Sequence, residues 1–153
     1  MSTTTPLSAS QQGTWRIFLR AHALLLRRLE SELLSEHDLP LPSYDVLVQL
    51  SEAPGRRLRM TELAERVLLS RSGLTRLVDR LVRDGLVARE ACPDDARGTL
   101  AVLLPAGLER LRTAWPTHLR GVSAHLGKLS PDEAEHLAAL LVKMVPEAAG
   151  DGR

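Results

Sequence analysis

One predicted helix carries hydroxyl and guanidinium groups on one side and apolar groups on the other. The apolar residues recur at the spacing of one helical face: Leu74, Leu77, Val78 and Leu81. The opposite face then presents short hydroxyls, arginines and one carboxylate: Arg71, Ser72, Thr75, Arg76, Asp79 and Arg80. The planar guanidinium group of Arg suits both phosphates and guanine edges. Such groups near a helix N-terminus favour insertion into the major groove of double-stranded DNA.

The residues of this face divide by the part of DNA that each suits. We assign Arg71 and Thr75 to base edges. Ser72 and Arg80 suit phosphates, and Arg76 suits either. The alternative is a solvated helix face that binds nothing, which is the better interpretation of such a pattern taken on its own.

The basic residues gather around this helix. The whole chain of 153 residues holds 20 basic and 19 acidic side chains, a net charge of +1. Residues 56–97 hold ten Arg against seven acidic residues, which leaves +3 in that stretch. The near-balance excludes a protein held to polyanions by bulk charge. One basic face remains possible, provided that the fold brings these arginines together.

Composition excludes several other classes. Cys92 is the only cysteine, so neither an intramolecular disulfide nor a Cys-only zinc site can form. Four aromatic residues are too few for a platform that stacks single-stranded bases. No apolar run reaches the roughly 18 residues of a membrane span, and residues 1–12 lack the pattern of a signal peptide. We therefore expect a cytoplasmic protein without a membrane partner.

The elements around this helix predict its setting. Residues 1–12 are expected to be a flexible N-terminus, and an apolar stripe predicts a long helix over 13–38. Then follow short helices near Pro42 and Glu62, a helix capped by Ser70, strands over 86–91 and 99–104, and helices from Pro105 and Ser130. This order predicts a mainly α fold with a small β-hairpin, a winged helix-turn-helix over residues 39–104.

Three short motifs in register resemble a known family. They are LTRLVDRL at 74–81, DGLV at 84–87 and the D-x-R-G sequence at 95–98. With the flanking LRMTELAERV and LLPAG segments, they resemble the MarR family of bacterial transcription regulators. The resemblance runs from about Leu39 to about Met144, which is most of the chain.

The resemblance implies a homodimeric regulator, more often a repressor, on a pseudo-palindromic DNA site. Residues 13–38 and 105–148 would form the dimerisation helices. The helix from Ser70 would enter the major groove, Arg97 would reach the minor groove, and Asp95 would position Arg97. A small aromatic or lipophilic acid would bind between the two regions and lower the affinity for DNA. Three residues on the first long helix are candidates for this ligand: Trp15, Arg16 and His22.

Three positions depart from the family pattern. Arg59 stands where many relatives carry a Ser or Thr that caps the next helix, and Leu104 replaces a frequent Thr before Pro105. Ala96 replaces a frequent second Arg of the wing. These changes put the affinity for DNA in doubt and leave the basic helix face intact. Arg59 also lies, with Arg56 and Arg57, in a loop that either touches phosphates or is solvated.

The sequence leaves other functions open. An oxidant-responsive regulator would use Cys92, but the neighbouring acidic residues disfavour its thiolate. A metal-responsive regulator would use histidines, yet His118 and His125 are seven residues apart, too far for one ion on a straight helix. A winged-helix module that binds protein and no DNA is the remaining alternative. No catalytic motif is present, so we expect neither an enzyme nor a cofactor.

Overall fold

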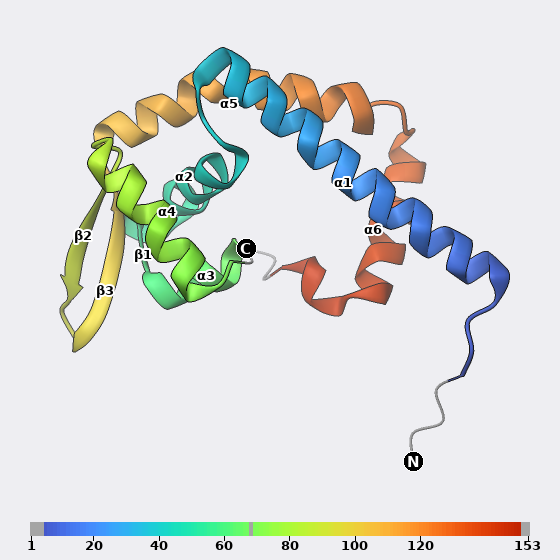
Figure 1. The fold of residues 1–153 in the computed structure, drawn as a ribbon, viewed down its shortest axis with the longest axis horizontal. Helices are drawn as coiled ribbons and strands as arrows, with labels where there is room; N and C mark the ends of the chain where they lie inside the picture. Colours follow the sequence, from blue (N-terminus) through green and yellow to red (C-terminus); the bar gives the residue numbers. More distant parts are fainter. Residues whose placement is uncertain (1–4, 68, 151–153) are drawn as a thin grey trace. The chain divides into compact units, whose positions relative to one another are not determined.

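The protein was examined as a computed structural model, which describes residues 5–67 and 69–150. The chain forms two compact units, residues 1–118 and 119–153, whose boundary falls within helix α5. The first unit contains α1 (Ala9–His37), α2 (Leu41–Glu52), the 3-10 turn η1 (Pro54–Arg56), β1 (Arg57–Arg59), α3 (Met60–Arg66), α4 (Arg71–Arg83), β2 (Val87–Cys92), β3 (Asp95–Leu103) and the start of α5 (Pro105–Leu126) (Figure 1). The second contains the end of α5, α6 (Pro131–Met144) and η2 (Pro146–Ala149). The prediction of a mainly α fold with a small β-hairpin wing is confirmed, and a third strand, β1, joins the hairpin.

The apolar side of α4 is buried in the centre of the first unit. Its four predicted core residues are at most 2% exposed: Leu74, Leu77, Val78 and Leu81. They join a cluster in which Leu47, Leu63 and Val87 are at most 1% exposed. Full burial of a side chain of this size stabilises a fold by roughly 1.5–3 kcal/mol. The same core therefore fixes which face of α4 points outward.

Local hydrogen bonds define the ends of the helices. The Ser70 hydroxyl accepts a bond from the Gly73 N–H at 3.1 Å, which confirms Ser70 as the N-cap of α4. After α4, Gly85 has φ +71°, a conformation that suits glycine. Helix α1 begins at Ala9, before the predicted boundary at residue 13, because Ser8 and Gln11 form a capping box there. The flexible segment predicted over residues 1–12 is therefore too long at its C-terminal end. Residues 1–4 lie outside the described part of the chain.

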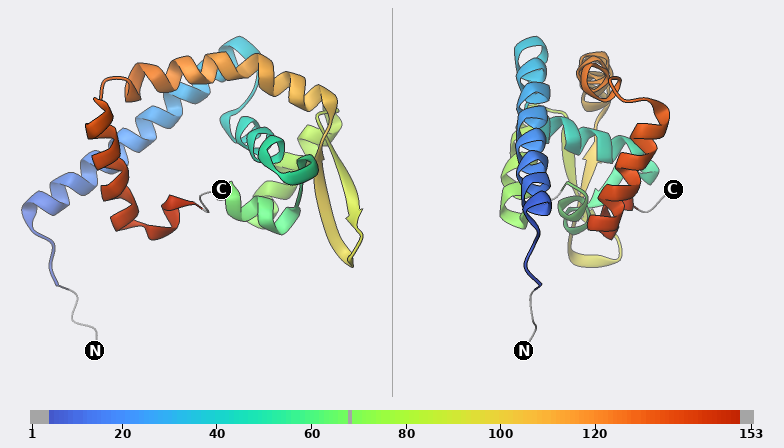
Figure 2. Two further views of the ribbon diagram at one scale, coloured as in Figure 1. Left: turned by 180° about the vertical axis from the view of Figure 1, so that it is seen from behind. Right: turned by 90° about the vertical axis from the view of Figure 1, so that its right-hand side faces the viewer.

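The sheet has three antiparallel strands in the order β1-β3-β2. The predicted turn over residues 92–98 is wrong, because Cys92 already pairs with Asp95 and leaves only two residues in the turn. Backbone pairing thus continues toward the tip of the hairpin, where Ala91 pairs with Thr99. Strand β1 adds Leu58 opposite Ala101 and so attaches the sheet to the helices. The two views of Figure 2 show the β2–β3 hairpin reaching beyond α3.

The last turn of α1 is attached to α5 inside the first unit. The Thr117 hydroxyl, which is buried, donates to Glu36 Oε2 at 2.9 Å and lies 2.8 Å from His37 Nε2. Arg110 Nη2 donates to the carbonyl oxygens of His37 at 2.5 Å and Asp38 at 3.3 Å. Leu33 is the only buried residue of α1. None of the described helices is long and apolar enough to cross a membrane.

Candidate nucleic-acid interface

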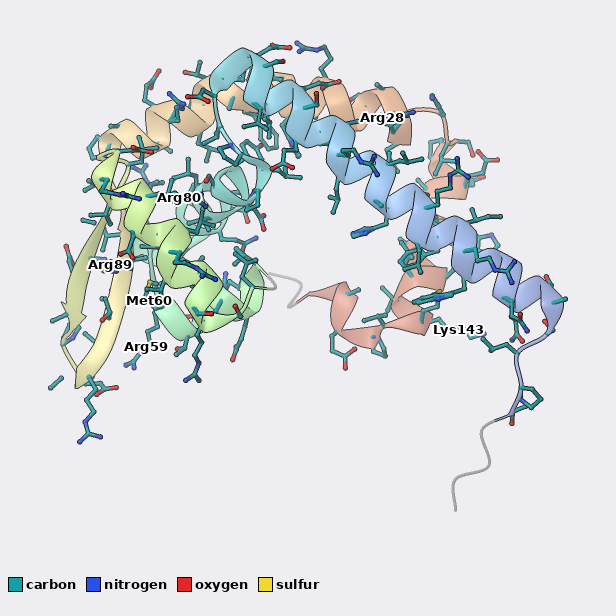
Figure 3. All side chains as sticks on the ribbon, viewed as in Figure 1. Arg28, Arg59, Met60, Arg80, Arg89 and Lys143 are labelled. Atoms are coloured by element: carbon teal, nitrogen blue, oxygen red, sulfur yellow. The ribbon has the colours of Figure 1, made fainter. Side chains whose placement is uncertain are left out.

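The outward face of α4 carries the predicted polar residues. Five of them are exposed: Arg71, Ser72, Thr75, Arg76 and Arg80. The helix begins with a Ser70 cap whose hydroxyl lies 3.3 Å from that of Ser72. Figure 3 shows Arg80 on the outer side of the α4 ribbon. The structure thus places these side chains on one exposed face, as the spacing predicted; which of them contact DNA stays a prediction.

The Thr75 hydroxyl is already engaged in a hydrogen bond, which limits what it can offer to a ligand. Its Oγ1 donates to the Arg71 carbonyl oxygen at 2.8 Å, one turn earlier in the same helix. The hydroxyl proton is therefore used inside α4, and the side chain offers a lone pair and a methyl group to a ligand. A methyl group and an acceptor are what the thymine methyl and the amino groups of adenine and cytosine can meet in the major groove.

The wing places Arg97 close to the β2–β3 turn, where it is exposed. Asp95 Oδ1 accepts a hydrogen bond from the Arg97 backbone N–H at 3.0 Å. Asp95 Oδ2 also lies 3.8 Å from Arg59 Nη1, a weak ion pair across the sheet. Asp95 therefore acts on the backbone of Arg97, and Arg59, which makes no cap for α3, pairs with the wing instead.

A cleft of about 360 Å³ separates the wing from α3 and α4. It is lined by Arg59, Met60, Thr61, Thr75, Arg89, Asp95, Arg97, Gly98 and Thr99. Figure 3 shows Arg59, Met60 and Arg89 between the wing strands and the helices. Three guanidinium groups against one carboxylate give this cleft an excess of positive charge. Such a charge attracts an anionic backbone.

This arrangement is shared with known proteins. A family model described as MarR family matches residues 37–98. The crystal structure of Sco3205, a MarR family transcriptional regulator from Streptomyces coelicolor in complex with DNA, aligns with a TM-score of 0.89 and 37% identity, covering 99% of this chain and 95% of that one. The transcriptional regulator HosA of Escherichia coli O111:H- is 30% identical over 72% of this chain and 82% of its own length.

The chain belongs to the MarR family of transcriptional regulators. The HTH-type transcriptional repressor YetL of Bacillus subtilis (strain 168) is 33% identical over 64% of this chain and 59% of its own length. The alignments cover only 55–59% of the first three curated relatives. Because the family consists of transcriptional regulators, the expectation that this MarR-family chain is not an enzyme is confirmed.

Two residues of the interface were not among the predicted site residues. Arg89 of β2 donates through Nη1 to Asp79 Oδ1 of α4, and through Nη2 to the Thr75 carbonyl oxygen at 3.2 Å. Asp79 was recognised on the polar face of the helix and given no role. The sequence signal for this pair was the Asp79 carboxylate, because an acidic side chain on a basic helix face favours a cationic neighbour.

The predicted ligand residues of this MarR-family chain lie together on α1. Trp15, Arg16 and His22 are exposed, and Phe18 stacks between the two rings, 5.8 Å from Trp15 and 6.3 Å from His22. None of the three lines the wing cleft, nor the open depression of about 610 Å³ at the end of α1. Their role in binding a ligand therefore stays a prediction.

Unpaired polar atoms lie between α2 and α5. The Tyr44 and His118 rings are 4.5 Å apart, and neither Tyr44 Oη nor His118 Nδ1 has a hydrogen-bond partner among the described residues. Burial, followed by the charges of Asp45 and Glu52, raises the pKa of Tyr44 to about 12. The Tyr44 hydroxyl thus stays protonated at neutral pH and can donate a hydrogen bond to an acid.

The sensing alternatives have little support from side-chain positions. The Cys92 side chain is buried at the end of β2. Within residues 5–67 and 69–150, no three His, Cys, Asp or Glu side chains are grouped so that they could hold a metal ion. Of the other histidines, His22 is stacked on Phe18 and His37 faces Thr117.

Proposed function

We propose that this MarR-family chain binds double-stranded DNA as a homodimer and represses transcription by occupying a promoter. The observation that carries the proposal is the division of α4. Its apolar side is at most 2% exposed, while its arginines and hydroxyls form one exposed face beside the basic wing cleft. The likeness to Sco3205, whose crystal structure is in complex with DNA, supports DNA binding by this chain.

Exposed apolar side chains support the homodimer. On α1, Trp15 is 49% and Ile17 71% exposed. In the second unit, the exposed large apolar residues are Leu119, Leu126, Leu137, Leu140, Met144 and Val145. Within each unit, large apolar side chains left exposed in this number are typical of an interface. A second copy of the chain is the proposed cover, and its α4 would meet the next major groove about 10 base pairs away.

Repression follows from where such a dimer sits. A dimer that occupies the same stretch of promoter DNA as the polymerase excludes the polymerase from it. The curated relative YetL is described as a repressor, which supports this sign of regulation. We further propose release by a small aromatic or lipophilic acid. The Trp15 and His22 rings and the Arg16 cation supply the stacking surface and the positive charge that such an acid needs.

The decisive experiment is selection of genomic DNA by the purified chain at physiological salt. Fragments retained against an excess of random-sequence competitor are sequenced, and the bound site is mapped by footprinting. We expect a few short sites with two-fold symmetry and half-sites about 10 base pairs apart. If no fragment is enriched while the protein is folded, the alternative of a protein-interaction module replaces the proposal. Aromatic acids added to the bound complex then test the release.

A further inference from the structure

Asp79 is the one acidic residue on the outward face of α4. It lies between Arg76 and Arg80 in the sequence, on a helix proposed to approach phosphates. A carboxylate repels the DNA backbone, so its presence there lowers affinity unless it has another use. The Asp79 side chain is 49% exposed, so burial in the core does not explain its position.

Asp79 forms an ion pair with Arg89 of the neighbouring strand β2. The Arg89 guanidinium donates to two groups of α4, the Asp79 carboxylate and the Thr75 carbonyl oxygen. These two acceptors are four residues apart, so one fork spans a full turn of the helix. The two bonds leave from different nitrogens of a planar group, which fixes direction as well as distance.

The anchor of this fork is the sheet. Arg89 pairs with Ala101, which is 0% exposed and belongs to β3, the central strand of the sheet. Strand β3 in turn carries Arg97 of the wing. Arg89 thus connects α4 to the same strand pair that presents the wing arginine, and both border the cleft of about 360 Å³.

Apolar packing alone leaves α4 some freedom. Leu74, Leu77, Val78 and Leu81 hold the helix by contacts that have no preferred direction. A small rotation about the helix axis would cost little burial but would move Arg71, Thr75 and Arg76 relative to base edges. Base contacts need a geometry held within about 0.5 Å. A directional bond outside the core supplies that constraint.

We propose that Arg89 and Asp79 form a clamp that sets the rotation of α4 against the wing and so determines sequence specificity. Both are positioning residues that act through Thr75 and its neighbours. The inference rests on the proposed function, DNA binding by α4. Because exposed ion pairs contribute little to stability, loss of the clamp changes specificity much more than folding.

Removing the charge of Asp79 tests the proposal, because the clamp and simple electrostatics predict opposite changes in the affinity for the specific duplex. Asp79→Asn keeps the shape of the side chain and removes one negative charge from the DNA side of α4. Electrostatics alone predicts tighter binding to any duplex. The clamp predicts the opposite for the specific site. We expect the Kd for a selected genomic duplex to rise by roughly tenfold, the size of one lost bidentate base contact. The Kd for a shuffled duplex should stay equal or fall.

A second variant separates the fork from the charge. Arg89→Lys keeps the cation but cannot donate to both acceptors in the same plane. We expect the same loss of the ratio between specific and shuffled Kd, with the salt dependence of specific binding unchanged. The double variant should be no worse than either single variant, because both changes remove the same clamp.

A matched control is the Arg57–Glu90 pair, which joins β1 and β2 at 3.0 Å and is about as exposed as the clamp. Glu90→Gln also removes one negative charge but makes no change to α4. We expect its specificity ratio to match that of the wild type. Melting temperatures and dimer masses of all variants are measured alongside, so that a variant that fails to fold is replaced by its partner in the pair.

Each other outcome contradicts the clamp in a different way. Equal or tighter specific binding by Asp79→Asn overturns it. A loss confined to one base pair, seen with Asp79→Asn and not with Arg89→Lys, makes Asp79 a base-reading residue instead. Equal losses on specific and shuffled duplexes show a folding defect without a positioning role. If the wild type itself selects no duplex, the proposed function is wrong, and the proposal of a clamp is wrong for that reason.

Discussion

Helices α1 and α4 treat their apolar residues in opposite ways. Helix α4 has 13 residues and buries four of them within its own unit. Helix α1 has 29 residues and buries only Leu33. Trp15, Leu19 and Leu26 share the side of α1 that carries Leu33, yet they are 42–49% exposed. The apolar side of α4 is complete within the first unit, whereas that of α1 is not.

This difference assigns the two helices different partners. Because the core holds α4 from one side, its polar side is available to a charged ligand such as DNA. Helix α1 offers apolar surface instead, which a second protein surface can cover and DNA cannot. We therefore propose that the wing cleft and the α4 face serve specificity, while α1 serves assembly. Changes in the two helices should separate these properties.

The largest effect is expected from a charge on α1. Leu26→Glu places a carboxylate on the proposed dimer face, once in each protomer. Two lost leucine contacts of roughly 1.5–3 kcal/mol each weaken the dimer by about 100-fold or more. Sedimentation equilibrium should show monomers at micromolar concentration, and specific DNA binding should fall with the dimer. Ser31→Glu, at an exposed position of the same helix, is the control. An intact Leu26→Glu dimer would remove α1 from the interface.

Next in size is the loss of one α4 arginine. Arg76→Ala should weaken specific binding by about 30-fold or more, since each of the two half-sites loses a contact of roughly 1–3 kcal/mol. Fluorescence anisotropy with a selected duplex measures the affinity, and the dimer mass should not change. Arg27→Ala removes the same charge from α1, at an exposed position, and serves as the control. If the two variants bind alike, bulk charge and not the face of α4 holds the DNA.

The wing arginine should have a smaller effect that shows mainly in salt dependence. Arg97→Ala removes one cation per protomer from an exposed tip. If each Arg97 neutralises one phosphate, the slope of log K against log salt should fall by about two for the dimer. Arg97→Lys keeps the charge and should keep the slope. An unchanged slope in Arg97→Ala would assign Arg97 to a contact other than phosphate.

The sequence predicted α4 well because its signals are local. The spacing of its apolar residues, the Ser70 cap and Gly85 all lie within 16 residues, and each was found in place. The Arg89–Asp79 pair joins a strand to a helix, so no single periodicity contains it. The strand ends at Cys92 and Asp95 were missed because backbone pairing carries the strands through a polar tip. The partner of α1 has no signal in one chain beyond unburied apolar residues.

The smallest expected effect concerns His118, a polar residue half-buried in the unit that buries the apolar side of α4. Burial, opposed by Asp45, lowers the pKa of His118, so the folded protein holds the neutral ring. The unfolded chain takes up a proton near pH 6.5, and the free energy of unfolding therefore falls as pH drops below that value. Burial raises the pKa of Asp45, which acts in the opposite sense in more acidic solution.

Urea unfolding between pH 7.5 and 5.5 measures this dependence. We expect the free energy of unfolding to fall less steeply with decreasing pH in His118→Asn than in the wild type. The difference in slope should be well under the roughly 1.4 kcal/mol per pH unit that uptake of one full proton gives. His22→Asn changes an exposed ring on α1 and should leave the slope as it is. If His22→Asn flattens the decline and His118→Asn does not, the pH-dependent contact lies on the α1 surface. The α1 surface would then hold a folding contact of its own, and the contrast between the buried apolar side of α4 and the exposed apolar side of α1 would no longer hold.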